Sequence, residues 1–179
     1  HQQIHRQKFL EGSNSLFLAC GRVFNEKRLI CIDVDDDRLV AVAKTVLDPV
    51  VCSRFGSKGI GIIIFVDAKD DFFKKKKVIK LADGELGIEL LTRGGGTFIP
   101  PSVHRKTGAT YKWLVGDLAT ELHNLPIMTR EQWDLLNSVI SSPEALTLLG
   151  GEATHDAMRD LCAKIVRCSE DNDYLVEVV

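Results

Sequence analysis

The chain has 179 residues, which is long enough for one ordinary domain with a small appendage. Its residues are 45% hydrophobic and 27% charged, a balance typical of a soluble globular protein. No apolar run approaches the ~18 residues of a membrane-spanning helix, and the polar opening HQQIHRQKF lacks the apolar core of a signal peptide. Membrane insertion and export are therefore not indicated, and we expect a cytoplasmic protein.

The formal net charge of −2 does not mark the whole chain as a binder of polyanions, although positive charge is concentrated at residues 74–77 and 93–112. The five cysteines form no CxxC pair and have no histidine at zinc-ligand spacing, so we expect buried, reduced thiols. The chain begins with His1 rather than Met, which is typical of a fragment that lacks an upstream portion.

The first part of the chain is rich in predicted strands. Apolar runs rich in β-branched residues predict strands at residues 28–34 and 62–66, and a shorter apolar run predicts another at 15–20. The apolar spacing of residues 37–47 predicts a helix that ends near Asp48 and Pro49. Residues 67–77 form a charged connector, which we interpret as a loop whose lysines face solvent.

Short strands continue to residue 115, and helices follow them. Apolar runs predict strands at 78–81, 87–91, 97–99 and 111–115. Two amphipathic helices are predicted at 129–140 and 154–167, each opened by a threonine in the N-cap position. This order predicts an α+β fold with a boundary near Pro126. We expect one domain at residues 1–126, truncated at its N-terminal end, and a helical C-terminal segment at 127–179.

Two acids end the strand at 28–34. Residues two apart in a strand point to the same face, so the carboxylates of Asp33 and Asp35 can converge on one site. Paired carboxylates are the ligands that Mg²⁺ and Mn²⁺ prefer. The alternative is an acidic loop that caps the strand or the next helix, a task that Asp36 and Asp37 would share.

A third acid, Glu89, lies inside the apolar strand at 87–91. A charge in such a place is unfavourable unless it is paired or bound to a metal, although an edge strand could turn it toward solvent. Three acids on strands suggest two-metal phosphoryl chemistry.

Two glycine-bearing segments offer further polar groups. The turn RFGSKG, at residues 54–59, supplies backbone amides, a hydroxyl and two cations that could hold a triphosphate, although a plain turn is the simpler interpretation. The segment RGGGTFIPPSVHRKTGATYKW, at residues 93–113, is the most distinctive in the chain. It is either a functional loop or a long hairpin with a rigid Pro-Pro bend.

These motifs resemble those of the bifunctional DNA primase/polymerase (prim-pol) branch of the archaeo-eukaryotic primases, which occurs in plasmid and phage replication proteins. ICIDVDDD is similar to the first motif of the family and RFGSKGIGIIIF to its second. GIELLTRGGGTFIPPSVHRKTGATYKW is similar to the third motif with the tail that follows it. The resemblance is strong for residues 28–113 and weak outside them.

The resemblance implies a prim-pol fold with an RRM-like catalytic sheet and a C-terminal helical segment. It implies a replicative primase/polymerase, a nucleotidyltransferase that joins nucleoside triphosphates on a single-stranded DNA template. A plasmid or phage origin and a fused or associated replicative helicase are implied as well. Two Mg²⁺ or Mn²⁺ ions would be held by Asp33, Asp35 and Glu89. The nucleotide would be held by Arg54, Ser57 and Lys58, with His104 or Arg105 assisting.

One departure from the family affects this interpretation. The second motif normally carries a histidine that contacts the phosphates of the nucleotide, and GIGIIIF has none. Arg54, Ser57, Lys58 or His104 would then have to substitute. A catalytically weak or inactive nucleic-acid-binding module stays open as an alternative. So does a haloacid-dehalogenase-like phosphatase, which also starts from Asp-x-Asp but wants Thr or Gly where this chain has DDR.

Overall fold

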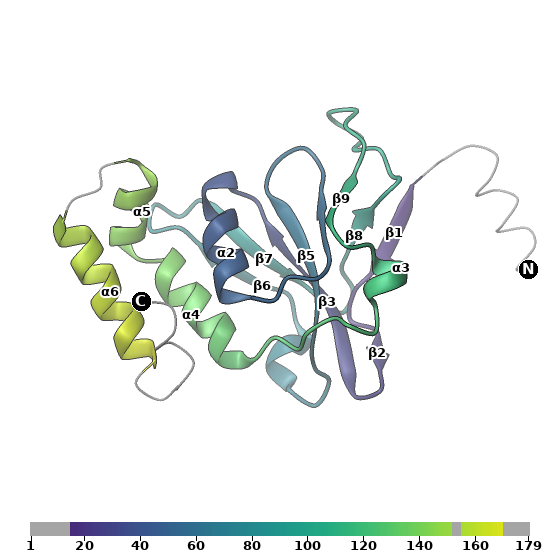
Figure 1. Cartoon of the computed structure of the whole chain (residues 1–179), viewed down its shortest axis with the longest axis horizontal. Coiled ribbons are helices and arrows are strands. Elements are labelled where there is room, and N and C mark those ends of the chain that lie inside the picture. Colours follow the sequence, from purple (N-terminus) through teal and green to yellow (C-terminus); the bar gives the residue numbers. More distant parts are fainter. Residues whose placement is uncertain (1–14, 152–154, 170–179) are drawn as a thin grey trace, which may run out of the picture.

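The computed structural model describes residues 15–151 and 155–169, and its centre is an antiparallel sheet (Figure 1). The strand order is β6-β7-β3-β5-β4-β9. Strand β2 pairs with the first two residues of β3, whereas β7 pairs with its last four. A separate two-stranded sheet pairs β1 with β8. The strands are β1 Leu16–Ala19, β2 Val23–Phe24, β3 Lys27–Val34, β4 Ser53–Phe55, β5 Ile60–Asp67, β6 Lys77–Lys80, β7 Leu86–Leu91, β8 Gly96–Ile99 and β9 Lys112–Val115.

Helices lie between and after these strands. They are the 3-10 turns η1 Asp37–Leu39 and η2 Asp71–Lys74, and the α-helices α2 Val40–Val46, α3 Leu118–Glu121, α4 Arg130–Ile140, α5 Pro143–Leu149 and α6 His155–Ser169. Among residues 15–151 and 155–169, none of these helices is a candidate for a membrane-spanning segment.

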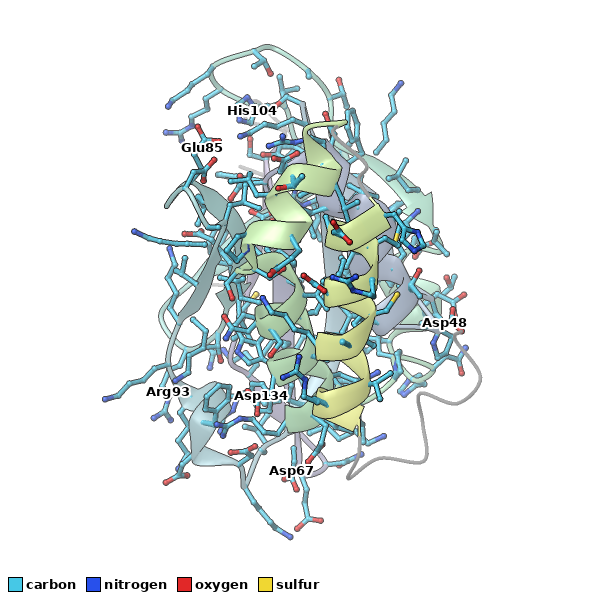
Figure 2. The ribbon with its side chains drawn as sticks, turned by 90° about the vertical axis from the view of Figure 1, so that its left-hand side faces the viewer. Asp48, Asp67, Glu85, Arg93, His104 and Asp134 are labelled. Atoms are coloured by element: carbon cyan, nitrogen blue, oxygen red, sulfur yellow. The ribbon has the colours of Figure 1, made fainter. Side chains whose placement is uncertain are left out.

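Alternation along β3 divides the interior into two clusters. Ile30, Ile32 and Val34 are buried on one face, where they join the larger cluster with side chains of α2 and α4. Leu29 lies on the other face, in a smaller cluster that includes Phe65 and packs against β1, β8 and α3. Helices α2 and α4 thus cover one face of the sheet, and α6 lies outside them in the foreground of Figure 2, while the other face of the sheet is only partly covered.

The hairpin that joins β2 to β3 shows how sequence directs this sheet. Its two turn residues, Asn25 and Glu26, have φ angles of 47° and 63°. Two successive positive φ angles define the type I′ turn, whose twist matches that of the flanking strands. Val23 consequently pairs with Arg28 across the hairpin.

The predicted α+β class is confirmed, and most predicted strands are present within two residues of their expected bounds. Helix α4 also begins as predicted, because Thr129 and Gln132 form a reciprocal capping box. The expected cap at Thr154 lies outside the described residues. Short elements were not predicted, namely β2, β4, η2, α3 and α5, and β4 covers the first two residues of the predicted turn at 54–59.

Two expectations need correction. The connector at 67–77 is not simply a solvent-facing loop, because it contains η2, whose Phe73 is buried in the larger cluster. The thiols of Cys20, Cys31 and Cys52 are buried as expected, but Cys162 is exposed on α6. The side chain of the fifth cysteine, Cys168, lies outside the described part of the structure.

The proposed boundary near Pro126 stays a prediction. Helix α4 follows that boundary in sequence, yet its Trp133, Leu136 and Ile140 belong to the same buried cluster as the sheet. Helix α6 packs on α4 and α5 rather than on the sheet (Figure 1).

Candidate active site

Three acids meet on the face of the sheet opposite α2 and α4. Asp33 on β3 is the direct register partner of Glu89 on β7. Asp35 follows two residues after Asp33, and its backbone N–H donates to the carbonyl of Gly87 at 3.0 Å, so it continues the pairing beyond β3. Since direct partners and residues two apart share a face, the strand register brings the three predicted acids together.

The surroundings of the two aspartates disfavour their charged forms. Burial raises the pKa of Asp33, the Arg54 guanidinium counteracts that rise, and the Glu89 carboxylate adds to it. Burial likewise raises the pKa of Asp35, with a further contribution from the carboxylate of Asp33. The acids are therefore close enough to repel one another, an arrangement that a bound cation would relieve.

The Arg54 guanidinium is the buried cation of the site. It donates from Nη2 to Asp33 Oδ1 at 2.9 Å, and from Nε and Nη2 to Thr97 Oγ1 at 3.0 and 2.5 Å. Its Cζ atom lies 5.1 Å from the ring centroid of Tyr111. With 7% of its side chain exposed, Arg54 is fixed by a carboxylate, a hydroxyl and an aromatic ring.

Gly61 makes this position of Arg54 possible. In the sheet, Gly61 on β5 pairs with Arg54 on one side and Asp33 on the other. The arginine side chain must therefore cross over residue 61 to reach Asp33. A Cβ atom at residue 61 would lie 2.7 Å from Arg54 Nε, well inside ordinary contact distance, so the crossing requires glycine at this position.

Lys58 approaches the site from the loop between β4 and β5. Its Nζ lies 3.9 Å from Asp35 Oδ1, and both Lys58 and its neighbour Ser57 are exposed. The loop is held down by Gly59, which has a φ of +57° and whose N–H donates to Asp37 Oδ1 at 2.6 Å. A side chain at residue 59 would collide with the carbonyl oxygen of Val34.

Lys76 was not predicted as a site residue, yet its Nζ lies 2.5 Å from Glu89 Oε1. It directly precedes β6, in which Val78 is the register partner of Glu89. Residues 76 and 78 share a strand parity, which places the lysine diagonally across from the glutamate. The run of four lysines concealed this contact, because nothing in the sequence sets the register between β6 and β7.

The segment after β8 contains His104 and Tyr111, which connect it to Arg54 through ring contacts. The His104 ring lies 6.0 Å from the ring of Tyr111, which itself contacts Arg54. His104 and Glu85 lie at the same end of the molecule, whereas Arg93 lies at the opposite end (Figure 2). Arg105 is exposed in the same loop as His104.

Ser102, from the Pro-Pro-Ser sequence, has a structural task. Its buried hydroxyl accepts from the N–H of Leu16 at 2.6 Å and donates to the carbonyl of Leu16 at 3.0 Å. It thereby fastens β1 beside β8.

The acids suit a hard divalent cation by their chemistry. Across residues 15–151 and 155–169, no group of three or more Asp, Glu, His or Cys side chains forms a ready-made metal site. Each of the three acids is directed toward a basic side chain. Three mutually repelling carboxylates on one face nevertheless form the donor set that Mg²⁺ and Mn²⁺ take in phosphoryl-transfer sites. Asp33, Asp35 and Glu89 would be the ligands.

Residues 1–128 match the model of the family described as bifunctional DNA primase/polymerase, N-terminal. The chain belongs to this prim-pol family. No curated protein and no solved structure matches it. Membership supports a DNA primase/polymerase type of function and, in general, nucleotidyltransferase activity. Prim-pol enzymes generally use divalent metals and act with DNA and nucleotides.

The prim-pol domain thus brings together five of the eight predicted site residues, namely Asp33, Asp35, Glu89, Arg54 and Lys58. Ser57 lies beside Lys58 in the exposed loop, His104 is linked to Arg54 through Tyr111, and Arg105 is exposed nearby in sequence. Sequence reasoning missed Lys76, Thr97 and Tyr111. Tyr111 lies in the distinctive segment at 93–113, two residues before Trp113, and this aromatic pair was a signal for it. No comparable signal marked Lys76 or Thr97.

Proposed function

We propose that this prim-pol domain catalyses template-directed, metal-dependent nucleotidyl transfer from nucleoside triphosphates on single-stranded DNA. The observation that carries the proposal is the meeting of Asp33, Asp35 and Glu89 on adjoining strands, beside the buried guanidinium of Arg54. Burial raises the pKa of Asp33 and of Asp35, and a role in binding cations explains why acids lie together in such a place.

Each residue has a task in this proposal. Divalent ions held by the three acids would neutralise charge on the attacking and leaving oxygens of the phosphoryl group. Arg54 keeps Asp33 oriented and opposes the rise in its pKa, because it donates to that carboxylate from a position fixed by Thr97. Lys58 lies at the exposed rim, where an ammonium can contact the triphosphate.

A binding module without catalysis is the second candidate. Two observations favour it. The ion pair between Arg54 and Asp33 already neutralises one of the acids, and strand β5, which contains Gly61, lacks the histidine that the second motif of the family normally carries. Such a module would hold DNA and leave the synthesis to another polypeptide. On the family resemblance we further propose an RRM-like catalytic sheet, association with a replicative helicase and a plasmid or phage origin.

Primer extension separates the two candidates. The chain is incubated with a primed single-stranded template, nucleoside triphosphates and Mg²⁺ or Mn²⁺. Asp33→Asn, Asp35→Asn and Glu89→Gln should each abolish extension, whereas Asp48→Asn, which alters an exposed acid after α2, should not. DNA binding by the unaltered chain without any extension would refute the enzymatic proposal and support the binding module.

A further inference from the structure

Each of the three acids is directed toward a basic side chain of its own, and this pairing has a consequence for how the site is loaded. Asp33 faces Arg54, Asp35 faces Lys58 and Glu89 faces Lys76. We infer that Lys76, together with Lys58, competes with metal ions for these carboxylates, so that metal binds tightly only in company with a nucleotide. The inference rests on the proposed function of the same site.

The charges explain the coupling. Three carboxylates and three cations cancel, so the free site offers little net attraction to a lone divalent ion. Two divalent ions would leave the same site with a large excess of positive charge. A nucleoside triphosphate carries roughly four negative charges at neutral pH, enough to balance two such ions. Metal and nucleotide together therefore restore neutrality, and metal alone does not.

The three cations differ in how easily they can leave. Arg54 is 7% exposed and fixed by Thr97, so it stays in place. The side chains of Lys58 and Lys76 are 64% and 55% exposed, and lysine pairs at such positions contribute little stability. Both ammonium groups can thus move from a carboxylate to a phosphate oxygen without disturbing the fold.

Lys76 is the more informative of the two lysines. Its contact with Glu89, at 2.5 Å, is much closer than the 3.9 Å contact of Lys58 with Asp35. The two lysines also come from opposite sides of the acid-bearing strands β7 and β3 in the sheet order, one from the segment before β6 and the other from the loop before β5. Released from the acids, they would flank a triphosphate that lies between them.

The experiment measures binding of Mn²⁺ to the full chain by electron paramagnetic resonance, with and without a non-hydrolysable nucleoside triphosphate analogue. Without nucleotide, Lys76→Gln should raise the affinity for Mn²⁺ by about threefold or more, because it removes a charge that competes at Glu89. With the analogue this gain should disappear, since the phosphate contact of Lys76 is lost as well. Lys75→Gln is the matched control, because Lys75 is the exposed neighbour and carries the same charge.

The outcomes are separable. A rise of less than about threefold for Lys76→Gln in the absence of nucleotide, or an equal rise for Lys75→Gln, overturns the inference about Lys76. Loss of Mn²⁺ binding in Glu89→Gln would still support the proposed function in that case. If the unaltered chain and every variant bind no Mn²⁺ even with the analogue, the proposed function fails and the inference fails with it. Thermal unfolding should show that Lys76→Gln stays folded.

Discussion

Replacing Gly61 with Ala puts a methyl group into the space that the Arg54 guanidinium occupies. The new Cβ would lie 2.7 Å from Arg54 Nε and 2.8 Å from Arg54 Cζ, about 1 Å inside ordinary contact distance. The guanidinium cannot move away without losing hydrogen bonds, because Thr97 and Asp33 hold it in a buried position. Either the arginine or strand β5 must shift.

A shift of that size would break the hydrogen bonds of Arg54 to Thr97 and Asp33. Hydrogen bonds to charged groups are worth about 1.5–3 kcal/mol each. Asp33 is partly exposed, so water compensates for some of the loss. We therefore expect Gly61→Ala to lower the free energy of unfolding by about 2–4 kcal/mol, and to weaken nucleotide binding because Arg54 no longer orients Asp33.

Urea unfolding measures the loss of stability, provided that Gly61→Ala leaves the slope of the unfolding free energy against urea concentration unchanged. Gly150→Ala is the control: the same methyl group would there meet only carbonyl oxygens, at 3.4 and 3.5 Å, and should change stability by less than about 0.5 kcal/mol. In an Arg54→Ala background, Gly61→Ala should cost far less, because the space is then open. A full-size cost in that background, or no cost in the original chain, would refute the reasoning.

Three further predictions concern stability. Asp35→Asn should raise the melting temperature in metal-free buffer at neutral pH, because burial and Asp33 raise the pKa of Asp35 and make its ionised form unfavourable. This gain in melting temperature should fade toward about pH 4, where the unaltered aspartate is protonated too. A gain that grows on acidification would contradict the prediction. Thr129→Ala removes one half of the capping box of α4 and should cost about 1 kcal/mol in urea unfolding, with no effect on Mn²⁺ binding. Leu136→Ala empties a fully buried position between α4 and the sheet, so a loss of about 2–5 kcal/mol is expected; a loss below about 1 kcal/mol would show that α4 does not share the core of the sheet.

The acids could be found from sequence because their signal is local. Asp33 and Asp35 follow a run of β-branched residues, and the period of two in a strand then places both on one face. The start of α4 could also be predicted from the sequence, because Thr129 and Gln132 are three residues apart before an apolar stripe. In both places the chemistry of a few neighbouring residues decides the structure.

The partners of the acids were harder to find because they depend on register. Lys76 meets Glu89 only through the pairing of β6 with β7, and a shift of one residue would have turned its side chain to the other face. Arg54 reaches Asp33 only because β4, β5 and β3 align at Gly61. Helices α3 and α5 were missed for a different reason: at four and seven residues they are too short to show a helical period.

The fastening of β1 by Ser102 bears on how the domain is assembled during translation. The hydroxyl of Ser102 binds Leu16, which lies 86 positions earlier in the chain. At ~5–20 residues per second, a ribosome needs roughly 4–17 seconds to cover that stretch, during which β1 waits without β8. Thr97, which fixes Arg54, belongs to the same late strand. The buried cation of the site is therefore locked only after most of the sheet has been synthesised, and truncated nascent chains that end before β8 should carry the acids without their fixed arginine.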